Sequence, residues 1–118
     1  MPPTRDSQLL KGVLSLLLLQ LLSEQESYGY QVVQRLHEDG FTDILDGTVY
    51  PALTRLEREG RVSARLVSST AGPARKYYRL TPAGYEALTE GAASWSALAD
   101  AVGSVLRRPV PAAPIEGP

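Results

Sequence analysis

The last third of the chain repeats apolar residues at alternating spacings of three and four positions. The repeat runs through Tyr85, Leu88, Ala92, Trp95, Ala99, Val102 and Leu106, and Leu98 and Val105 widen it. On a helix this spacing places the side chains on one stripe, like the seam of a coiled coil about three heptads long. Such a stripe needs another helix to cover it. The sequence therefore predicts a long C-terminal helix that packs against a second copy of the chain.

An uncharged run, Gly12–Leu22, lies near the start of the sequence. It is too short for a membrane-spanning helix, which needs about 20 apolar residues. A secretory signal would end in small residues, whereas Ser23–Glu26 follows here. The run instead predicts a helix from about Gln8 to Gln25, buried on more than one side, with one side facing a partner subunit. We expect no membrane association and a cytoplasmic protein.

A second helix is predicted over Tyr28–Glu38, where apolar residues recur every four positions. Ser27 is its expected N-cap, and Gly40 is its expected stop.

A third helix is expected to begin near Asp46 or Thr48 and to end at Glu59. Proline is tolerated in the first turn of a helix, so Pro51 limits how much earlier this helix can begin. Three helices in this order, with a brief turn between the second and the third, indicate a helix-turn-helix unit.

The periodicity then changes to that of strands. Val62–Ser68 and Arg75–Leu80 partly alternate between apolar and polar residues, and Ser69–Ala74 between them is rich in turn formers. This predicts a β-hairpin with a polar tip. Thr81-Pro82 then supplies an N-cap and a first-turn proline for the last helix.

Together these segments predict a mainly α fold of the α+β kind: a winged helix-turn-helix with a β-hairpin wing and a long C-terminal dimerisation helix. The expected divisions are a DNA-binding domain over residues 8–81, the dimerisation helix over 82–107 and a disordered, proline-rich tail over 108–118.

The charge of the chain is distributed unevenly. The net charge is -1, which by itself disfavours a polyanionic partner. Residues 46–80, however, hold seven basic and three acidic residues, while residues 23–45 hold one basic and five acidic residues. The positive charge thus falls on the third helix and the hairpin, the two elements that a winged helix presents to DNA.

The sequence offers little material for catalysis or metal binding. It contains no cysteine, and His37 is its single histidine. Thiolate metal sites, disulfides and cysteine nucleophiles are excluded, and we expect neither an enzyme nor a cofactor.

Three segments resemble the PadR family of bacterial transcriptional regulators: Asp46–Gly60 at the recognition helix, Arg75–Gly84 at the second wing strand, and Tyr28–Tyr30 at the start of the second helix. The single helix after the wing resembles the smaller PadR subfamily, which includes multidrug-sensing repressors. The resemblance implies a homodimer in which the last helix packs against the first and last helices of the partner. The expected interface residues are Leu14, Leu17, Leu18, Leu88, Ala92, Trp95, Val102 and Leu106.

The expected partner is double-stranded DNA with an inverted-repeat operator, because a symmetric dimer places two recognition helices about one helical turn apart. The candidate DNA-binding residues lie on the outward side of the third helix, on the wing and on the second helix. They are Gln31, Thr48, Tyr50, Pro51, Thr54, Arg55, Arg58, Arg75 and Lys76. Arg55 is suited to a bidentate contact with guanine. Tyr50 is interpreted either as a DNA contact or as intramolecular packing, and Arg79 is expected to reach across the hairpin.

The resemblance also implies a small-molecule effector at the dimer interface that releases a repressor from DNA. Trp95, Ala99 and Asp100 are the candidate effector residues, with a planar or cationic molecule as the ligand. A tryptophan at a heptad position usually just packs, so simple packing is the other interpretation of Trp95. The alternative function is a winged-helix module for protein interaction without an effector.

Overall fold

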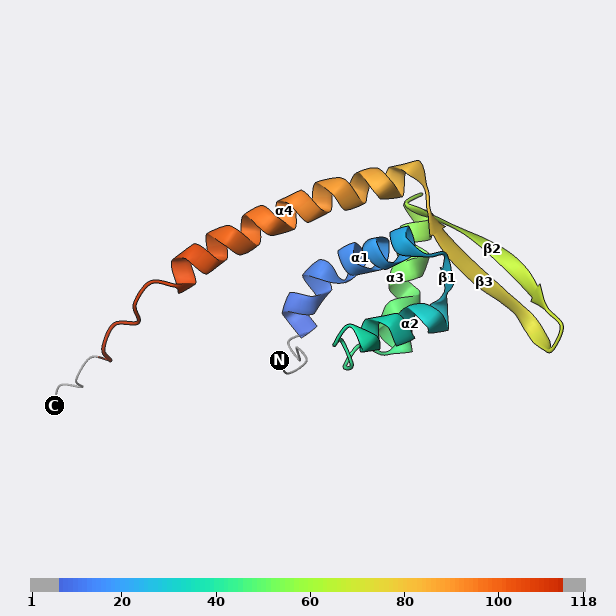
Figure 1. The fold of residues 1–118 in the computed structure, drawn as a ribbon, viewed down its shortest axis with the longest axis horizontal. Helices are drawn as coiled ribbons and strands as arrows, with labels where there is room; N and C mark the ends of the chain where they lie inside the picture. Colours follow the sequence, from blue (N-terminus) through green and yellow to red (C-terminus); the bar gives the residue numbers. More distant parts are fainter. Residues whose placement is uncertain (1–6, 114–118) are drawn as a thin grey trace.

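The computed structural model describes residues 7–113, except for the side chains of residues 7–9 and 11. This part of the chain forms four helices and one three-stranded antiparallel sheet. In chain order they are α1 (Ser7–Glu24), β1 (Ser27–Tyr28), α2 (Gly29–Glu38), α3 (Asp46–Arg58), β2 (Val62–Ser69), β3 (Gly72–Leu80) and α4 (Pro82–Leu106). Helices α1, α2 and α3 gather into one body, from which the hairpin and α4 project in opposite directions (Figure 1). The predicted winged helix-turn-helix is confirmed.

The core lies between α1, α2, α3 and the base of the sheet. α2 and α3 each contribute one apolar stripe, and α1 contributes most because it is apolar nearly all round. The buried apolar side chains are Leu14, Leu18, Leu19, Leu21, Leu22, Val32, Val33, Leu36, Ile44, Val49, Ala52, Leu53, Leu56, Val62, Tyr78 and Leu80. The body of the winged helix is therefore complete within one protomer.

Ser27 corrects one prediction. It is not the N-cap of α2: that position is Tyr28, without a capping side chain. Ser27 instead lies in the short strand β1, paired with Tyr78 of β3, and it is fully buried. Its hydroxyl donates to the carbonyl of Gln25 and accepts from Arg35. β1 thus adds a third strand that the sequence analysis missed.

The hairpin is longer than predicted. Thr70 and Ala71 alone form its turn, and Gly72–Ala74, predicted as loop, belong to β3. The register pairs Val62 with Leu80 at the base and Ser69 with Gly72 at the tip. The turn formers mark the end of the hairpin, but ladder pairing continues through most of them.

The turn between α2 and α3 and the start of α3 are fixed locally. Gly40 ends α2 with a φ of 98°, as predicted, because a left-handed conformation suits glycine. His37 donates from Nε2 to the carbonyl of Ile44 at 2.6 Å, which ties this turn to α2. α3 begins at Asp46, the earlier of the two predicted starts, and Pro51 lies in its second turn rather than its first.

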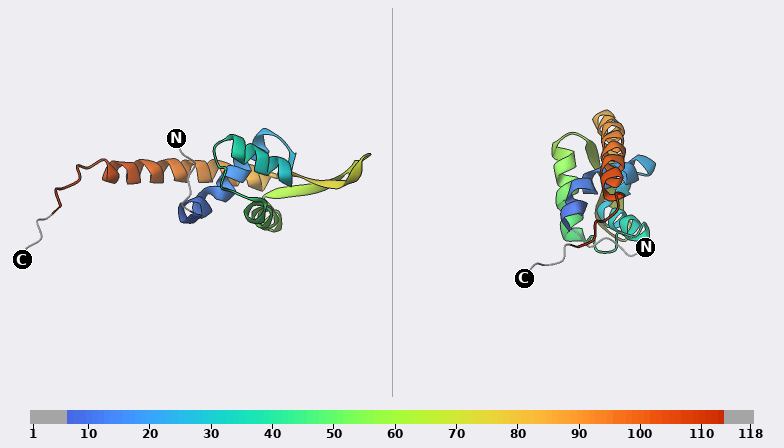
Figure 2. Two further views of the ribbon diagram at one scale, coloured as in Figure 1. Left: turned by 90° about the horizontal axis from the view of Figure 1, so that it is seen from below. Right: turned by 90° about the vertical axis from the view of Figure 1, so that its left-hand side faces the viewer.

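α4 is one uninterrupted helix whose far half leaves the body of the protomer (Figures 1 and 2). Its predicted start is confirmed, because the Thr81 hydroxyl accepts from the Gly84 amide and Pro82 follows. The described chain measures 73 × 29 × 22 Å. Residues 109–113 after the helix have no regular structure, and the remainder of the predicted tail, 114–118, lies outside the described residues.

Among residues 7–113, no helix is long and apolar enough to cross a membrane.

Candidate nucleic-acid interface

The outward side of α3 carries the predicted DNA-binding residues in one exposed row. Val49, Ala52, Leu53 and Leu56 face the core and are buried. The remaining candidates on this helix are all exposed: Thr48, Tyr50, Pro51, Thr54, Arg55 and Arg58. The amphipathic pattern of α3 thus leaves one polar, basic side free for a ligand.

Tyr50 packs within the protomer and also keeps an exposed side. One edge of its ring packs so closely on Gly29 that no side chain larger than glycine fits there, while 41% of the residue stays exposed. Burial raises the pKa of the Tyr50 hydroxyl, and the negative charge of Asp46 adds to this effect. Tyr50 is therefore a neutral hydrogen-bonding group fixed in place by α2.

The two arginines of α3 differ in their surroundings. Arg55 Nη2 donates to Ser15 Oγ of α1 at 3.3 Å, which orients its guanidinium along the side of the body. Arg58, in the last turn, is exposed, and its side chain makes no hydrogen bond or ion pair to any described residue. Thr54, between Tyr50 and these arginines, donates its hydroxyl to the Tyr50 carbonyl at 3.0 Å.

The wing directs its two predicted contacts to opposite faces. Arg75 lies over the ring of Tyr28, with its guanidinium carbon 4.5 Å from the ring centroid, and Tyr28 meets Tyr77 edge to face at 5.3 Å. Lys76, on the other face, donates from Nζ to Glu57 Oε1 of α3 at 2.9 Å. Alternation along β3 separates these two side chains.

Gln31 is partly buried on α2. Its side-chain oxygen is enclosed and has no hydrogen-bond partner among the described residues. A phosphate accepts hydrogen bonds, so only the amide nitrogen of Gln31 is suited to bind one.

One ion pair at the base of the wing was not found from the sequence. Arg65 forms a two-pronged ion pair with Glu26, at 2.9 and 2.7 Å, and the hydrogen bond from Arg65 lowers the pKa of Glu26. These residues are 39 positions apart, and no local pattern signals such a pair. Arg79 does reach across the hairpin as predicted, to Ser63 at 3.5 Å.

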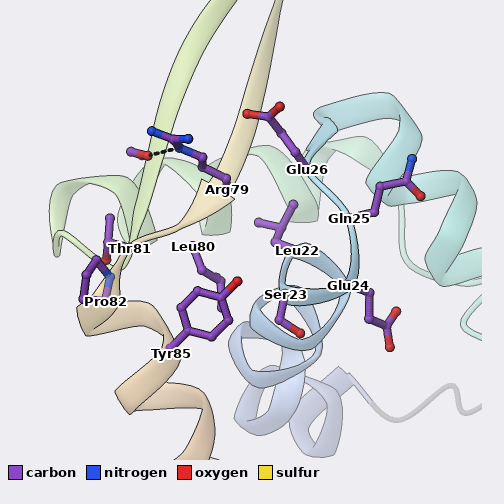
Figure 3. A pocket seen from close by; sticks show the side chains of 11 residues that line it. Leu22, Ser23, Glu24, Gln25, Glu26, Arg79, Leu80, Thr81, Pro82 and Tyr85 are labelled. Carbon is purple, nitrogen blue, oxygen red and sulfur yellow. Dashed lines mark hydrogen bonds between the residues drawn. The ribbon is translucent and has the colours of Figure 1, made fainter.

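A cavity of about 550 Å³ lies beside this base, between the end of α1 and the start of α4 (Figure 3). Its charged lining residues are Glu24, Glu26 and Arg79. Glu24 pairs with Arg35 at 2.9 Å, Glu26 pairs with Arg65, and Arg79 donates to Ser63. These three charged groups are engaged with the protein itself, so we do not assign this cavity to the nucleic-acid interface.

A second cavity, of about 350 Å³, separates α1 from α4; we call it the α1–α4 groove. Its lining residues are Gly12, Val13, Ser15, Leu16, Leu19, Arg61, Ala87, Gly91, Ser94, Trp95 and Leu98. Of the three predicted effector residues it includes Trp95, whereas Ala99 and Asp100 lie outside the lining. Arg61, which the sequence analysis did not select, is its one charged lining residue among those described.

The predicted dimer residues fall into three groups. Leu14 and Leu18 of α1 are 5% and 0% exposed in the protomer core, so they offer no surface to a partner, and the expectation for them is corrected. Leu17 and Leu88 are partly buried against that core. The others, on α4, are exposed: Ala92, Trp95, Val102 and Leu106.

Comparisons with known proteins agree with this architecture. The sequence model of the transcriptional regulator PadR-like family matches residues 18–90, more than half of the chain. A transcriptional regulator from Mycobacterium tuberculosis is 40% identical over 81 residues, which make up 68% of this chain and 73% of the relative.

Solved structures give the same result. A PadR-like transcriptional regulator from Bacillus cereus superposes with a TM-score of 0.78 and 38% identity, covering 86% of this chain and 99% of the other. A regulator of the same family from Eggerthella lenta superposes with a TM-score of 0.79 and 35% identity, covering 86% and 88% of the two chains.

Proposed function

The chain belongs to the PadR-like family of transcriptional regulators, which bind DNA and are not enzymes, and from this premise we propose that it acts in the cytoplasm as a homodimeric repressor released by a small molecule. The observation that carries the proposal is the exposed basic side of α3 next to a basic wing. Arg55 and Arg58 lie on that helix, and Arg75 lies on the wing. In a winged helix these elements enter the major groove and reach the flanking backbone.

The exposed stripe of α4 supports the dimer. Side chains along it that are about half exposed or more are Tyr85, Trp95, Leu98, Val102, Val105 and Leu106. Burying one large apolar side chain contributes about 1.5–3 kcal/mol, so several at once make a stable interface. A second α4 with the same stripe is the natural cover. Two protomers related by a two-fold axis would read an inverted repeat with half-sites about one helical turn apart.

We propose the α1–α4 groove as the effector site. Trp95 supplies a flat apolar surface, which favours a planar ligand. Asp100 lies outside the groove and Arg61 lines it, so the electrostatics disfavour the cationic ligand that the sequence suggested.

A connection from this groove to α3 supports release by the effector. The amide of Thr81 donates to the Arg61 carbonyl at 3.1 Å, and the Thr81 hydroxyl donates to the Gly60 carbonyl at 2.6 Å. Gly60 and Arg61 come just after Glu59, the C-cap of α3, and Thr81 is the N-cap of α4. A ligand that moves α4 would therefore move the recognition helix as well.

A salt titration of DNA binding tests the proposal. Duplexes of about 30 base pairs, three helical turns long, can be selected by the wild-type protein from a randomised pool. Affinity that falls steeply with salt, together with an inverted repeat among the selected sequences, would support it. Absence of salt-dependent binding would favour the alternative, a winged helix used for protein interaction.

A further inference from the structure

Glu57 lies where the proposed DNA interface should be positive. It is in the last turn of α3, one residue before the exposed Arg58, and its side chain is 34% exposed. A carboxylate there repels phosphates and lowers the affinity for any duplex. An exposed ion pair adds little to folding stability, so stability alone does not account for this residue.

The contact of Glu57 with Lys76 suggests what it does. Lys76 Nζ donates to Glu57 Oε1 at 2.9 Å and lies 5.5 Å from the centroid of the Tyr78 ring. The hydrogen bond that Lys76 donates to Glu57 raises the pKa of Lys76, so the ammonium group stays charged. The ammonium group is thereby held toward α3, and the middle of β3 is tied to the end of the recognition helix.

Other wing cations are not held in this way. Arg75 stacks on Tyr28 on the opposite face of β3, and Arg65 is paired with Glu26 near the hairpin base. Among the described residues, Lys76 is thus the wing cation that is bound directly to α3. Within residues 7–113 this is the one side-chain hydrogen bond between the wing and α3, the two elements proposed to meet DNA.

We propose that Glu57 is a positioning residue that determines specificity: it sequesters Lys76 from phosphates and fixes the wing relative to α3. This inference rests on the proposed DNA-binding function. With the pair intact, the wing contributes less to the affinity for DNA of arbitrary sequence. A duplex is then bound well when it fits α3 and the wing in their fixed arrangement.

The proposal predicts a specific effect of Glu57→Gln. Lys76 becomes free to contact a phosphate on any duplex, so the salt dependence steepens by about 0.9 in log–log slope. This corresponds to about a threefold larger loss of affinity between about 50 mM and 200 mM salt. Binding to unrelated duplexes should strengthen more than binding to selected duplexes, because the wing also loses its fixed position. The specificity ratio should therefore fall.

Glu59→Gln is the matched control. It removes the same charge two residues away, where the carboxylate is 44% exposed and meets Arg61 at 3.9 Å without touching Lys76. We expect this variant to strengthen binding to both duplexes equally, with an unchanged slope and specificity ratio. A second control repeats Glu57→Gln in a Lys76→Gln background, where no ammonium can be released and the slope should not steepen.

The experiment measures fluorescence anisotropy with a selected duplex and a scrambled duplex of the same composition, at several salt concentrations. We expect Glu57→Gln to show a steeper slope of log affinity against log salt and a lower specificity ratio. Both effects should depend on Lys76 and be absent in Glu59→Gln. Equal behaviour of the two glutamate variants, or a Glu57→Gln effect that persists without Lys76, would overturn the inference alone. If the wild-type protein shows no salt-dependent binding, the proposed function fails and the inference fails with it.

Discussion

The main-chain carbonyl of Arg61 lies against the α-carbon of Gly84 with no room for a side chain between them. This contact joins the segment after α3 to the first turn of α4. The Thr81 hydroxyl links both sides, because it donates to Gly60 and accepts from the Gly84 amide. The joint between α3 and α4 therefore includes a direct backbone contact, which yields less than flexible side chains do.

Gly84→Ala should destabilise the protein, although alanine favours helices. The helix propensity gain of about 1 kcal/mol is outweighed because the new Cβ overlaps the Arg61 carbonyl, and overpacking of this kind costs about 1–3 kcal/mol. Urea unfolding measures the difference. Gly12→Ala on α1 is the control: nothing lies within 4 Å of its new Cβ, so it should stabilise the protein by about 1 kcal/mol. Similar stabilisation by both variants would contradict the tight joint.

Arg55→Ala should weaken binding to selected duplexes by about 1–3 kcal/mol more than binding to scrambled ones, because a bidentate contact with guanine discriminates between bases. Gel-shift titrations with the two duplexes measure this. Ser15→Ala removes the intramolecular partner of Arg55, 3.3 Å away, and should leave binding nearly unchanged. Equal losses on both duplexes for Arg55→Ala would make it a phosphate contact instead.

The Glu26–Arg65 pair should give the stability a pH dependence. Since Arg65 lowers the pKa of Glu26 in the folded state, the contribution is present above the ordinary pKa of 4.5 and is lost as the pH falls through the lowered value. Melting temperatures of the wild type and Glu26→Gln should therefore differ at neutral pH and converge in acid. If the difference between the two melting temperatures instead stays constant down to about pH 3, the ionised pair contributes nothing to folding.

The limits of sequence reasoning are visible at particular residues. The periodicity of α3 and the Thr81-Pro82 start of α4 are local signals, and both were found. Ser27 was assigned as a cap because its local sequence allows one, but its strand partner Tyr78 lies 51 positions away. The same holds for Glu57 and Lys76, whose pairing depends on how the hairpin folds back on α3. Local patterns predicted the elements, while contacts between elements required the structure.

Val102→Asp should dissociate the proposed dimer. Val102 is 47% exposed on the α4 stripe, and symmetry places the change twice in the interface. Losing about 1.5 kcal/mol at each of two positions weakens association by about a hundredfold. Ser104→Asp adds the same charge about 200° around the helix, on the opposite side, and should leave the dimer intact. Sedimentation equilibrium distinguishes the two, and equal effects would mean that another face of α4 forms the interface.

The fluorescence of Trp95 should report ligands of the α1–α4 groove, because Trp95 is the single tryptophan of the chain and lines that groove. Two planar probes of similar size separate shape from charge: the cation proflavine and the anion anthracene carboxylate. We expect quenching by the anion at lower concentration, since Arg61 is the charged residue in the described lining. Arg61→Gln should remove this preference while quenching remains. If neither probe quenches an intact dimer, Trp95 serves packing alone; a preference for the cation would instead indicate that acidic groups outside the groove, such as Asp100, determine the choice.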